Sequence, residues 1–172
     1  MSLFKAREWW SAGRREETSS SLSVGTLTGG EQGNQQIIVG SLTGLLQVYQ
    51  PTARQDQGYS VEDLMLEQRL GAPILQLKCG TFMSGSQSGG SQQLAVLHPR
   101  QLSVFYLSRN QGTDAQGDSY ALTLVYQHIL TRSSYSFVTG SFGGGQTREY
   151  IAVLSLDGAI SIFEQDSHSF TR

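Results

Sequence analysis

Short runs of alternating apolar and polar residues recur along this chain, and polar, glycine-rich segments separate them. The clearest run spans Ile151 to Phe163, where two apolar stretches flank Leu156, Asp157 and Gly158. Alternation with a period of two predicts strands, and Asp-Gly between two strands predicts a type I′ turn. This segment is therefore predicted to be a β-hairpin.

Two earlier segments repeat the pattern of this hairpin. Ile37 to Tyr49 matches it position for position, and Leu94 to Phe105 matches it with one residue fewer at the turn. The three copies begin at residues 37, 94 and 151, a spacing of 57 residues both times. A fixed period of this length indicates a repeat architecture rather than a set of independent hairpins.

Each repeat is predicted to begin with a strand before the hairpin. This first strand ends on a glycine, a hydroxyl residue and a bulky apolar residue, and we call these three residues the triplet. The predicted first strands are Leu22 to Leu27, Leu75 to Phe82 and Tyr135 to Phe142. They contain the triplets Gly25-Thr26-Leu27, Gly80-Thr81-Phe82 and Gly140-Ser141-Phe142.

A fourth apolar run follows the first two hairpins, at Leu64 to Leu70 and Leu122 to Leu130, and none is predicted after the third. Four antiparallel strands in each repeat of about 57 residues predict an all-β fold, the β-propeller. The signature residues of WD40 and kelch repeats are absent. The chain is thus predicted to form about three four-stranded blades.

The predicted domain organisation has two parts. Residues 1–21 are an N-terminal segment and connector, and residues 22–172 are an incomplete β-propeller with blades starting near residues 22, 75 and 135. A closed ring of about 4–8 blades of this length would need roughly 230 to 450 residues, so we expect the N-terminal portion of a longer protein. Leu3 to Trp10 fits either a short helix or a strand, and we predict an outer strand of the last blade. Residues 84–93 are rich in Ser, Gly and Gln and are predicted to form a flexible loop.

Six apolar positions share the same place in the three hairpins, and we predict that all six are buried between blades. Such burial follows because each blade covers its apolar faces with its neighbours. The six residues are Val39, Val96, Val153, Val48, Val104 and Ile162.

Composition narrows the classes of function. Charged residues make up 15% of the chain and the net charge is −2, which gives no electrostatic support for binding nucleic acid or a membrane surface. No apolar run approaches 18 residues, so no transmembrane segment is predicted. The single cysteine, Cys79, excludes an internal disulfide and a cysteine zinc site. These features favour a soluble cytosolic protein.

No reaction chemistry is predicted from the motifs. His98, His128 and His168 lack the HExxH spacing of zinc proteases. The stretch Gly140 to Gly145 resembles a phosphate loop, but it lacks Gly-Lys-Ser/Thr and leads into a predicted strand. Asp157 is interpreted as a turn residue, and no Gly-x-Ser-x-Gly elbow occurs. We therefore predict no catalytic, cofactor-binding or metal-binding residues, and a protein that is not an enzyme.

Several segments resemble the N-terminal region of the Bardet–Biedl syndrome subunit nine family, the parathyroid-hormone-responsive subunits of the BBSome. The similarity covers essentially all 172 residues in order, and the opening ten residues are its most specific part. Residues 19–35 and 84–93 differ from the family pattern. The matching segments are Met1–Trp10, Ile37–Ser41, Leu94–His98, Gly140–Gly144, and Asp157–Gly158 followed by Phe163–Gln165.

The resemblance implies an N-terminal β-propeller in a non-catalytic scaffold subunit. It implies a coat-like hetero-octamer that moves membrane proteins to and from cilia and supports cilium assembly. The implied partners are the other BBSome subunits and, through the complex, ciliary membrane-protein cargo and an Arf-like small GTPase, with no nucleic acid and no cofactor. The implied location is the cytoplasm, the cilium and the ciliary base, peripheral to the ciliary membrane.

Two alternatives remain open at this point. One is a propeller enzyme of the glycosidase or lyase type, with its site at the mouth of the central channel, because fold alone does not decide function. Two or more carboxylates converging in the channel would favour it. The other is a peptide-binding propeller that acts outside cilia.

Overall fold

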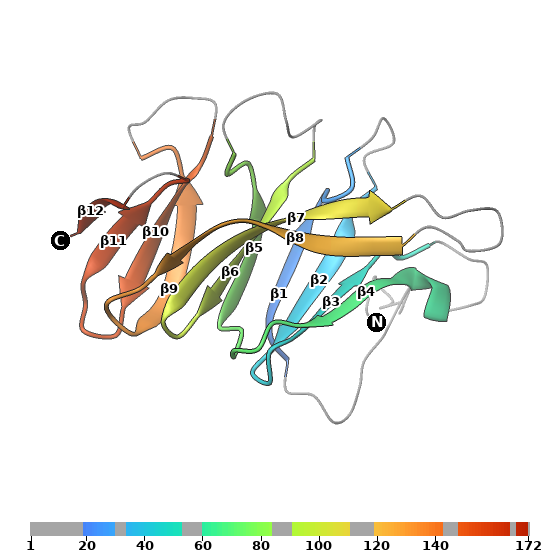
Figure 1. Cartoon of the computed structure of the whole chain (residues 1–172), viewed down its shortest axis with the longest axis horizontal. Helices are drawn as coiled ribbons and strands as arrows, with labels where there is room; N and C mark the ends of the chain where they lie inside the picture. The colour runs from blue at the N-terminus through green and yellow to red at the C-terminus, as the bar shows by residue number, and fades with distance from the viewer. Residues whose placement is uncertain are drawn as a thin grey trace, which may run out of the picture.

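The computed structural model describes residues 19–29, 34–52, 60–83, 91–110, 119–142 and 148–165 with their side chains, and residues 168–171 as backbone. The strands in these ranges form three separate four-stranded antiparallel sheets (Figure 1). A short 3-10 helix, η1 (Val61–Asp63), precedes the last strand of the first sheet. Within the described ranges, no helix has the length and apolar character needed to cross a membrane.

In each sheet, strands that follow one another in the chain are also neighbours in space. The first sheet contains β1 (Ser19–Gly25), β2 (Gln36–Ser41), β3 (Leu45–Tyr49) and β4 (Leu64–Arg69). The second contains β5 (Gln76–Gly80), β6 (Gln93–His98), β7 (Gln101–Asn110) and β8 (Ser119–Ile129). The third contains β9 (Ser134–Gly140), β10 (Tyr150–Ser155), β11 (Ile160–Phe163) and β12 (His168–Thr171).

The predicted repeat of strand, hairpin and outer strand is confirmed, with a correction in the third copy. The predicted first strands correspond to β1, β5 and β9, and the predicted outer strands correspond to β4 and β8. The third sheet was predicted to lack an outer strand, which is wrong, because β12 pairs with β11 in antiparallel register. This strand has only four residues, His-Ser-Phe-Thr, which is too short and too polar for its alternation to be recognised in the sequence.

The predicted type I′ turn at Asp157-Gly158 is also corrected. Among the described residues near this turn only Gly158 has a positive φ, at 85°, whereas a type I′ turn needs two such residues. The Gly158 N–H donates to the Ser155 carbonyl at 3.0 Å, and the Ser155 N–H donates to the Ala159 carbonyl at 2.8 Å. The loop therefore has three residues and ends on a left-handed glycine, and Gly44 has the same role in the first hairpin with φ 83°.

Two apolar clusters hold the three sheets together face to face. The cluster between the first and second sheets includes Ile38, Val48, Leu77 and Val96. The cluster between the second and third sheets includes Leu97, Val104, Phe137 and Val153. Because successive residues of a strand point to opposite faces, the second sheet supplies alternate residues of β6 to the two clusters. This is the packing of neighbouring blades.

Burial of the six equivalent apolar positions is confirmed for four of them. Those four are at most 1% exposed, and they are Val48, Val96, Val104 and Val153. The prediction is wrong for Val39 and Ile162, which are half-buried. Both belong to the end sheets and lie on the face opposite to the clusters, since their neighbours Ile38 and Phe163 are the residues that join the clusters.

The hairpin of β7 and β8 is long and reaches across to the first sheet (Figure 1). Its outer half carries Leu107 into the cluster between the first two sheets. The pairing of β7 with β8 has a bulge between Val104 and Phe105, where β8 has one extra residue. A bulge increases the local twist, and beyond it the hairpin contacts the first sheet instead of the third. The prediction for Leu3 to Trp10 lies outside the described residues, as do residues 84–90 of the loop predicted over 84–93. That loop prediction is wrong for Gln93, which begins β6.

Candidate interaction surfaces

A glutamine or glutamate of one sheet binds the end of the first strand of the preceding sheet, and this contact occurs twice. The Gln92 N–H donates to the Thr26 carbonyl at 2.8 Å, and the Gln92 Oε1 accepts from the Thr26 N–H at 2.9 Å. The Glu149 N–H donates to the Thr81 carbonyl at 2.7 Å, and its Oε2 accepts from the Thr81 N–H at 3.1 Å. Both backbone groups of the hydroxyl residue in the triplet are thus paired with the next sheet.

The glycine of the triplet leaves space for this contact. A Cβ at Gly25 would clash with Cys79 and would lie 2.6 Å from Gln92 Oε1. A Cβ at Gly80 would clash with the carboxylate of Glu149. A side chain at position 25 would meet Cys79 Cβ, and one at position 80 would displace the Glu149 carboxylate and the Phe82 ring, so glycine preserves both contacts.

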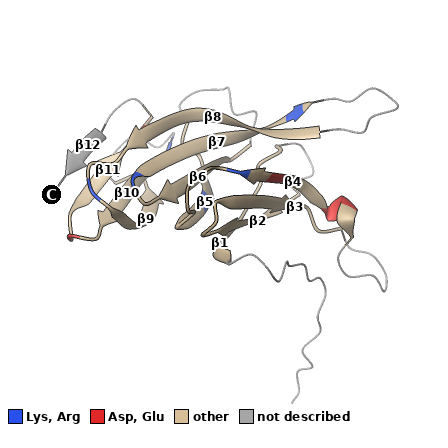
Figure 2. Cartoon of the chain, turned by 60° about the horizontal axis from the view of Figure 1, so that its bottom comes forward, with Lys and Arg blue, Asp and Glu red and all other residues tan. Residues whose placement is uncertain are grey.

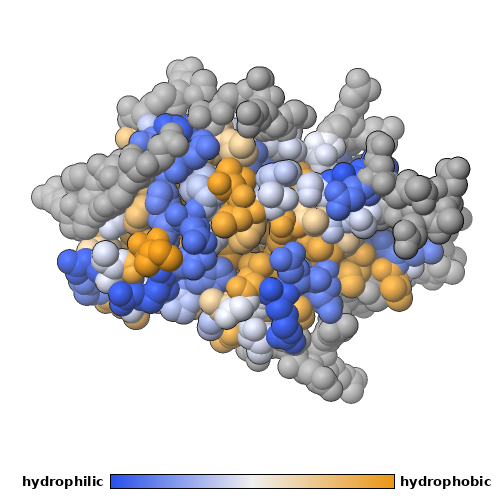
Figure 3. Space-filling model, viewed as in Figure 1, coloured by the Kyte–Doolittle hydropathy of each residue, from blue (hydrophilic) through white to orange (hydrophobic). Residues whose placement is uncertain are grey.

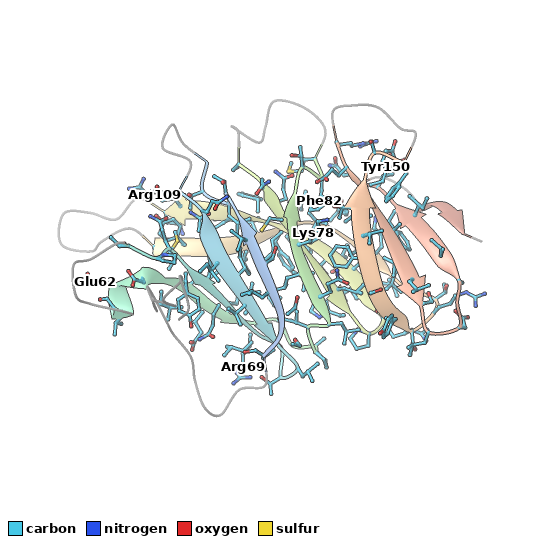
Figure 4. The ribbon with its side chains drawn as sticks, turned by 180° about the vertical axis from the view of Figure 1, so that it is seen from behind. Glu62, Arg69, Lys78, Phe82, Arg109 and Tyr150 are labelled. Atoms are coloured by element: carbon cyan, nitrogen blue, oxygen red, sulfur yellow. The ribbon has the colours of Figure 1, made fainter. Side chains whose placement is uncertain are left out.

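The apolar residue of the triplet fills the space between two sheets. Leu27 is 1% exposed and lies in the cluster between the first and second sheets. Phe82 is fully buried between the second and third sheets (Figure 4). The backbone N–H of each is held by a buried glutamine of its own sheet, Gln36 at 2.7 Å and Gln93 at 2.8 Å.

Side chains of the first strands add a further contact between sheets. Ser21 of β1 accepts a hydrogen bond from the Leu77 N–H at 2.8 Å. Gln76 of β5 binds Phe137 of β9 in both directions, accepting from its N–H and donating to its carbonyl, each at 2.8 Å. Ser21 and Gln76 each lie four residues before the glycine of the triplet, so the repeat fixes this contact as well.

The two end sheets each present an outward apolar face. On the first sheet, Leu22 and Val24 are 67% and 52% exposed. On the third sheet, Val138, Leu154 and Ile160 are each exposed by more than a third of their surface. The broad face in the view of Figure 1 differs, because polar side chains there interrupt the apolar ones (Figure 3). Among the described residues, the outward faces of the two end sheets are therefore candidate docking surfaces.

Charged residues are scattered over the described strands, and no stretch of one sign gathers in Figure 2. Arg148 and Glu164 form an ion pair at 2.6 Å, and Arg132 pairs with Asp157 at the third hairpin. A surface hollow of about 530 Å³ lies beside this second pair, next to Thr131 and Leu156. Among the described residues, the charges are therefore not concentrated on one face.

Two groups have a shifted pKa. Burial raises the pKa of the Cys79 thiol to about 11, and the Ser23 hydroxyl opposes this only in part. At Asp157 partial desolvation acts upward, but the Ala159 N–H and the Arg132 guanidinium outweigh it, so the pKa of this carboxyl lies below its ordinary value. The raised pKa keeps the Cys79 thiol protonated and therefore unreactive. The lowered pKa of Asp157 reflects hydrogen bonds within an exposed turn.

The histidines take part in packing. His98 Nδ1 lies 2.9 Å from the Pro73 carbonyl oxygen, and His128 Nε2 lies 2.6 Å from the Glu164 carbonyl oxygen. The His128 ring also lies 5.1 Å from the Phe163 ring. The side chain of His168 is outside the described residues. Within the described part of the chain, no three His, Cys, Asp or Glu side chains form a group that could hold a metal ion.

Sequence reasoning identified the triplets but missed their partners. Gln92 and Glu149 lie 57 residues apart, each directly before the second strand of its sheet, and Gln35 occupies the same place in the first repeat. That spacing was visible in the sequence. It was overlooked because a repeated polar residue before a strand is commonly part of a solvated loop.

Comparison with known proteins gives a family match over the whole chain. The sequence model of the family described as PTHB1 N-terminal matches residues 1–172. Protein PTHB1 of Xenopus laevis is 41% identical over 176 residues, and Protein PTHB1 of Mus musculus and of Homo sapiens are each 40% identical. These matches cover 100% of the chain and 20% of each relative, so the chain spans about a fifth of the length of these relatives.

Two solved structures share the fold at low sequence identity. BBS1N, from a crystal structure in complex with ARL6DN, aligns with a TM-score of 0.57 and 14% identity over 87% of this chain and 38% of its own. The WD40 domain of SCAP from fission yeast aligns with a TM-score of 0.51 and 15% identity over 90% of this chain and 31% of its own. These similarities confirm the predicted β-propeller fold.

Proposed function

This chain belongs to the PTHB1 N-terminal family, and we propose that it acts as a non-catalytic scaffold region of a BBSome subunit. In this role it contributes to a coat-like complex that carries membrane proteins to and from cilia. The observation that carries the proposal is the 40–41% identity to PTHB1 proteins over the entire chain.

The geometry supports a scaffold because repeated hydrogen bonds and apolar packing join the three sheets to one another. Thr26 is joined to Gln92, and Thr81 to Glu149, by one backbone-to-backbone hydrogen bond and one hydrogen bond to the side chain each. Two apolar clusters fill the remaining space between the sheets. Rigid sheets with defined outer surfaces suit the binding of protein partners. We propose as partners the other BBSome subunits and, through the complex, ciliary cargo and an Arf-like small GTPase; the BBS1N structure was solved with ARL6DN.

The alternative of a propeller enzyme has less support from the three carboxylates described in and beside the third sheet. Glu149 binds the backbone of Thr81, and Glu164 pairs with Arg148. Asp157 pairs with Arg132 in the turn of an outer hairpin. Each of these acids thus has a structural contact, whereas a hydrolytic pair needs two carboxylates that face one substrate.

The proposal is tested by purifying the tagged full-length protein from ciliated cells and quantifying the co-purifying proteins by mass spectrometry. We expect the other BBSome subunits in near-equal molar amounts, and the fluorescently labelled protein at the cilium and its base. The matched control is the same protein with Val153→Asp, which places a charge in the cluster between the second and third sheets and should abolish co-purification by unfolding this region.

Two outcomes would contradict the scaffold proposal. Recovery of the protein without other BBSome subunits would show that it acts outside that complex. Turnover of a glycan or a similar substrate by the purified protein, lost in Asp157→Asn or Glu149→Gln, would favour the enzyme alternative.

A further inference from the structure

Strand β8 presents the longest unpaired strand edge among the described residues. It has eleven residues, Ser119–Ile129, and within its sheet it pairs only with β7. Its N-terminal half lies over the first sheet, where Tyr120 and Leu122 pack (Figure 1). Its C-terminal half runs along the upper boundary of the described strands in Figure 2. The N–H and C=O groups along such an edge can bind another extended chain.

The register of the β7–β8 hairpin shows which backbone groups of β8 point outward. The Leu130 N–H, just beyond β8, donates to the Arg100 carbonyl at 2.9 Å. Opposite residues of an antiparallel pair alternate between hydrogen-bonded and non-hydrogen-bonded positions. From this end of the hairpin the register continues without a shift through Gln127. The backbone N–H and C=O groups of Ile129 and Gln127 therefore point away from β7, to the outer edge.

The outer strands of the other two sheets are protected against strand addition, whereas β8 is not. Strand β4 carries two charged residues, Glu67 and Arg69, and β12 has only four residues. Charged side chains and short length are two of the devices that keep an edge strand from pairing with another chain. Strand β8 contains no Lys, Arg, Asp, Glu or Pro. Its Leu124 and Ile129 are 46% and 69% exposed, so the open half of this edge is both uncharged and apolar.

A hollow beside the C-terminal end of β8 can receive a side chain. It has a volume of about 130 Å³ and is lined by His128 of β8, Leu130, and residues of β10 and β11 that include Val153 and Phe163. Val153 and Phe163 belong to the cluster between the second and third sheets, so part of the lining is apolar. In strand addition, backbone hydrogen bonds hold the added segment, and pockets for its alternate side chains select its sequence. The edge and the hollow together supply both elements.

We propose that the edge of β8 from residue 123 to residue 129 binds an extended segment of a partner protein as an added β-strand. The chemistry of the edge determines the occupant, which is an uncharged segment with apolar residues at alternate positions. Its backbone pairs with Gln127 and Ile129, and its side chains cover Leu124 and Ile129. One small apolar side chain of the segment enters the hollow. The proposal goes beyond the scaffold role and does not depend on it, because strand addition at β8 requires no BBSome subunit.

The test uses a phage-displayed library of random peptides, selected against the full-length protein. The edge is blocked by Gln127→Pro, which removes an outward N–H and no hydrogen bond to β7. The matched control is Glu67→Pro on the edge of β4. Both residues lie three positions before a leucine, Leu130 or Leu70, whose N–H donates to the turn of the preceding hairpin. We expect selected peptides with alternating apolar residues, whose Kd rises by about tenfold or more in Gln127→Pro and stays unchanged in Glu67→Pro.

A second measurement leaves the protein unchanged and modifies the selected peptide instead. Only alternate N–H groups of an added strand face β8, so methylation of one alternate set of backbone nitrogens should abolish binding, and methylation of the other set should not.

Three outcomes would overturn the proposal. The first is a selection that enriches no peptide. The second is a peptide that binds wild type and Gln127→Pro equally, or that binds equally well with either set of nitrogens methylated. The third is a dimer of the full-length protein that Gln127→Pro dissociates, because the occupant would then be a second copy. None of these outcomes depends on whether BBSome subunits co-purify, so this proposal and the scaffold proposal fail separately.

Discussion

Phe82 gives the sharpest test of how the sheets are held together. It is fully buried in the cluster between the second and third sheets, and its N–H is bound by Gln93. A buried phenylalanine removes about 150–250 Å² from water, and truncation to alanine also leaves a cavity. We expect Phe82→Ala to lower the free energy of unfolding by about 3–5 kcal/mol.

The matched control is Phe142→Ala, the same substitution at the equivalent repeat position. Because Phe142 is half exposed in this chain, its truncation should cost less than about 1 kcal/mol. Urea unfolding of both variants, followed by circular dichroism in the β-sheet region, gives the two free energies. Equal losses in the two variants would refute the argument that the neighbouring sheet, rather than the residue type, determines the contribution of this position.

Further predictions concern one core residue and two titratable groups. Val153→Ala should lower the free energy of unfolding by about 1–3 kcal/mol in urea, whereas the exposed Val138→Ala should change it by less than about 0.5 kcal/mol. The folded-state pKa of Cys79, about 11, lies above its ordinary value of 9.0. The neutral thiol therefore makes its full contribution to the free energy of unfolding below pH 9, and this contribution is lost as the pH rises toward 11. Stability should fall over that window by on the order of 2–3 kcal/mol more in the wild type than in Cys79→Ala. For Asp157, removal of the guanidinium in Arg132→Gln should raise the carboxyl pKa toward its ordinary value in an NMR titration. An unchanged pKa would show that the backbone N–H groups sustain the shift without the guanidinium.

The sequence was sufficient to predict the strands of the first two sheets and the first three strands of the third. Alternation of apolar residues determines which face of a strand is buried, and the 57-residue spacing placed three copies in register. It also placed Val96 and Val104 between sheets, where both are fully buried. Each of these properties either is local to one strand or recurs at a fixed interval along the chain. A single sequence is therefore enough to predict them.

Other features depend on contacts with residues that a sequence pattern does not identify. Strand β12 exists because β11 offers it a free edge, and its own four residues carry almost no alternation. The pairing of Gln92 with Thr26 joins residues from different sheets, and it becomes evident only when the sheets are placed face to face. The turn at Gly158 was mispredicted because the hairpin register, which decides the loop length, is a property of both strands.

The third repeat also differs from the others within its own sheet, and this difference bears on Phe142. The glutamines that bind the N–H groups of Leu27 and Phe82 are replaced at the equivalent position by Tyr150, whose side chain lies under the guanidinium of Arg148. Tyr150 itself has no amide oxygen that could bind the Phe142 N–H as Gln36 and Gln93 bind those of Leu27 and Phe82. A positive φ at a residue with a Cβ costs about 1–2 kcal/mol, so Phe142 is in a conformation that its sequence disfavours.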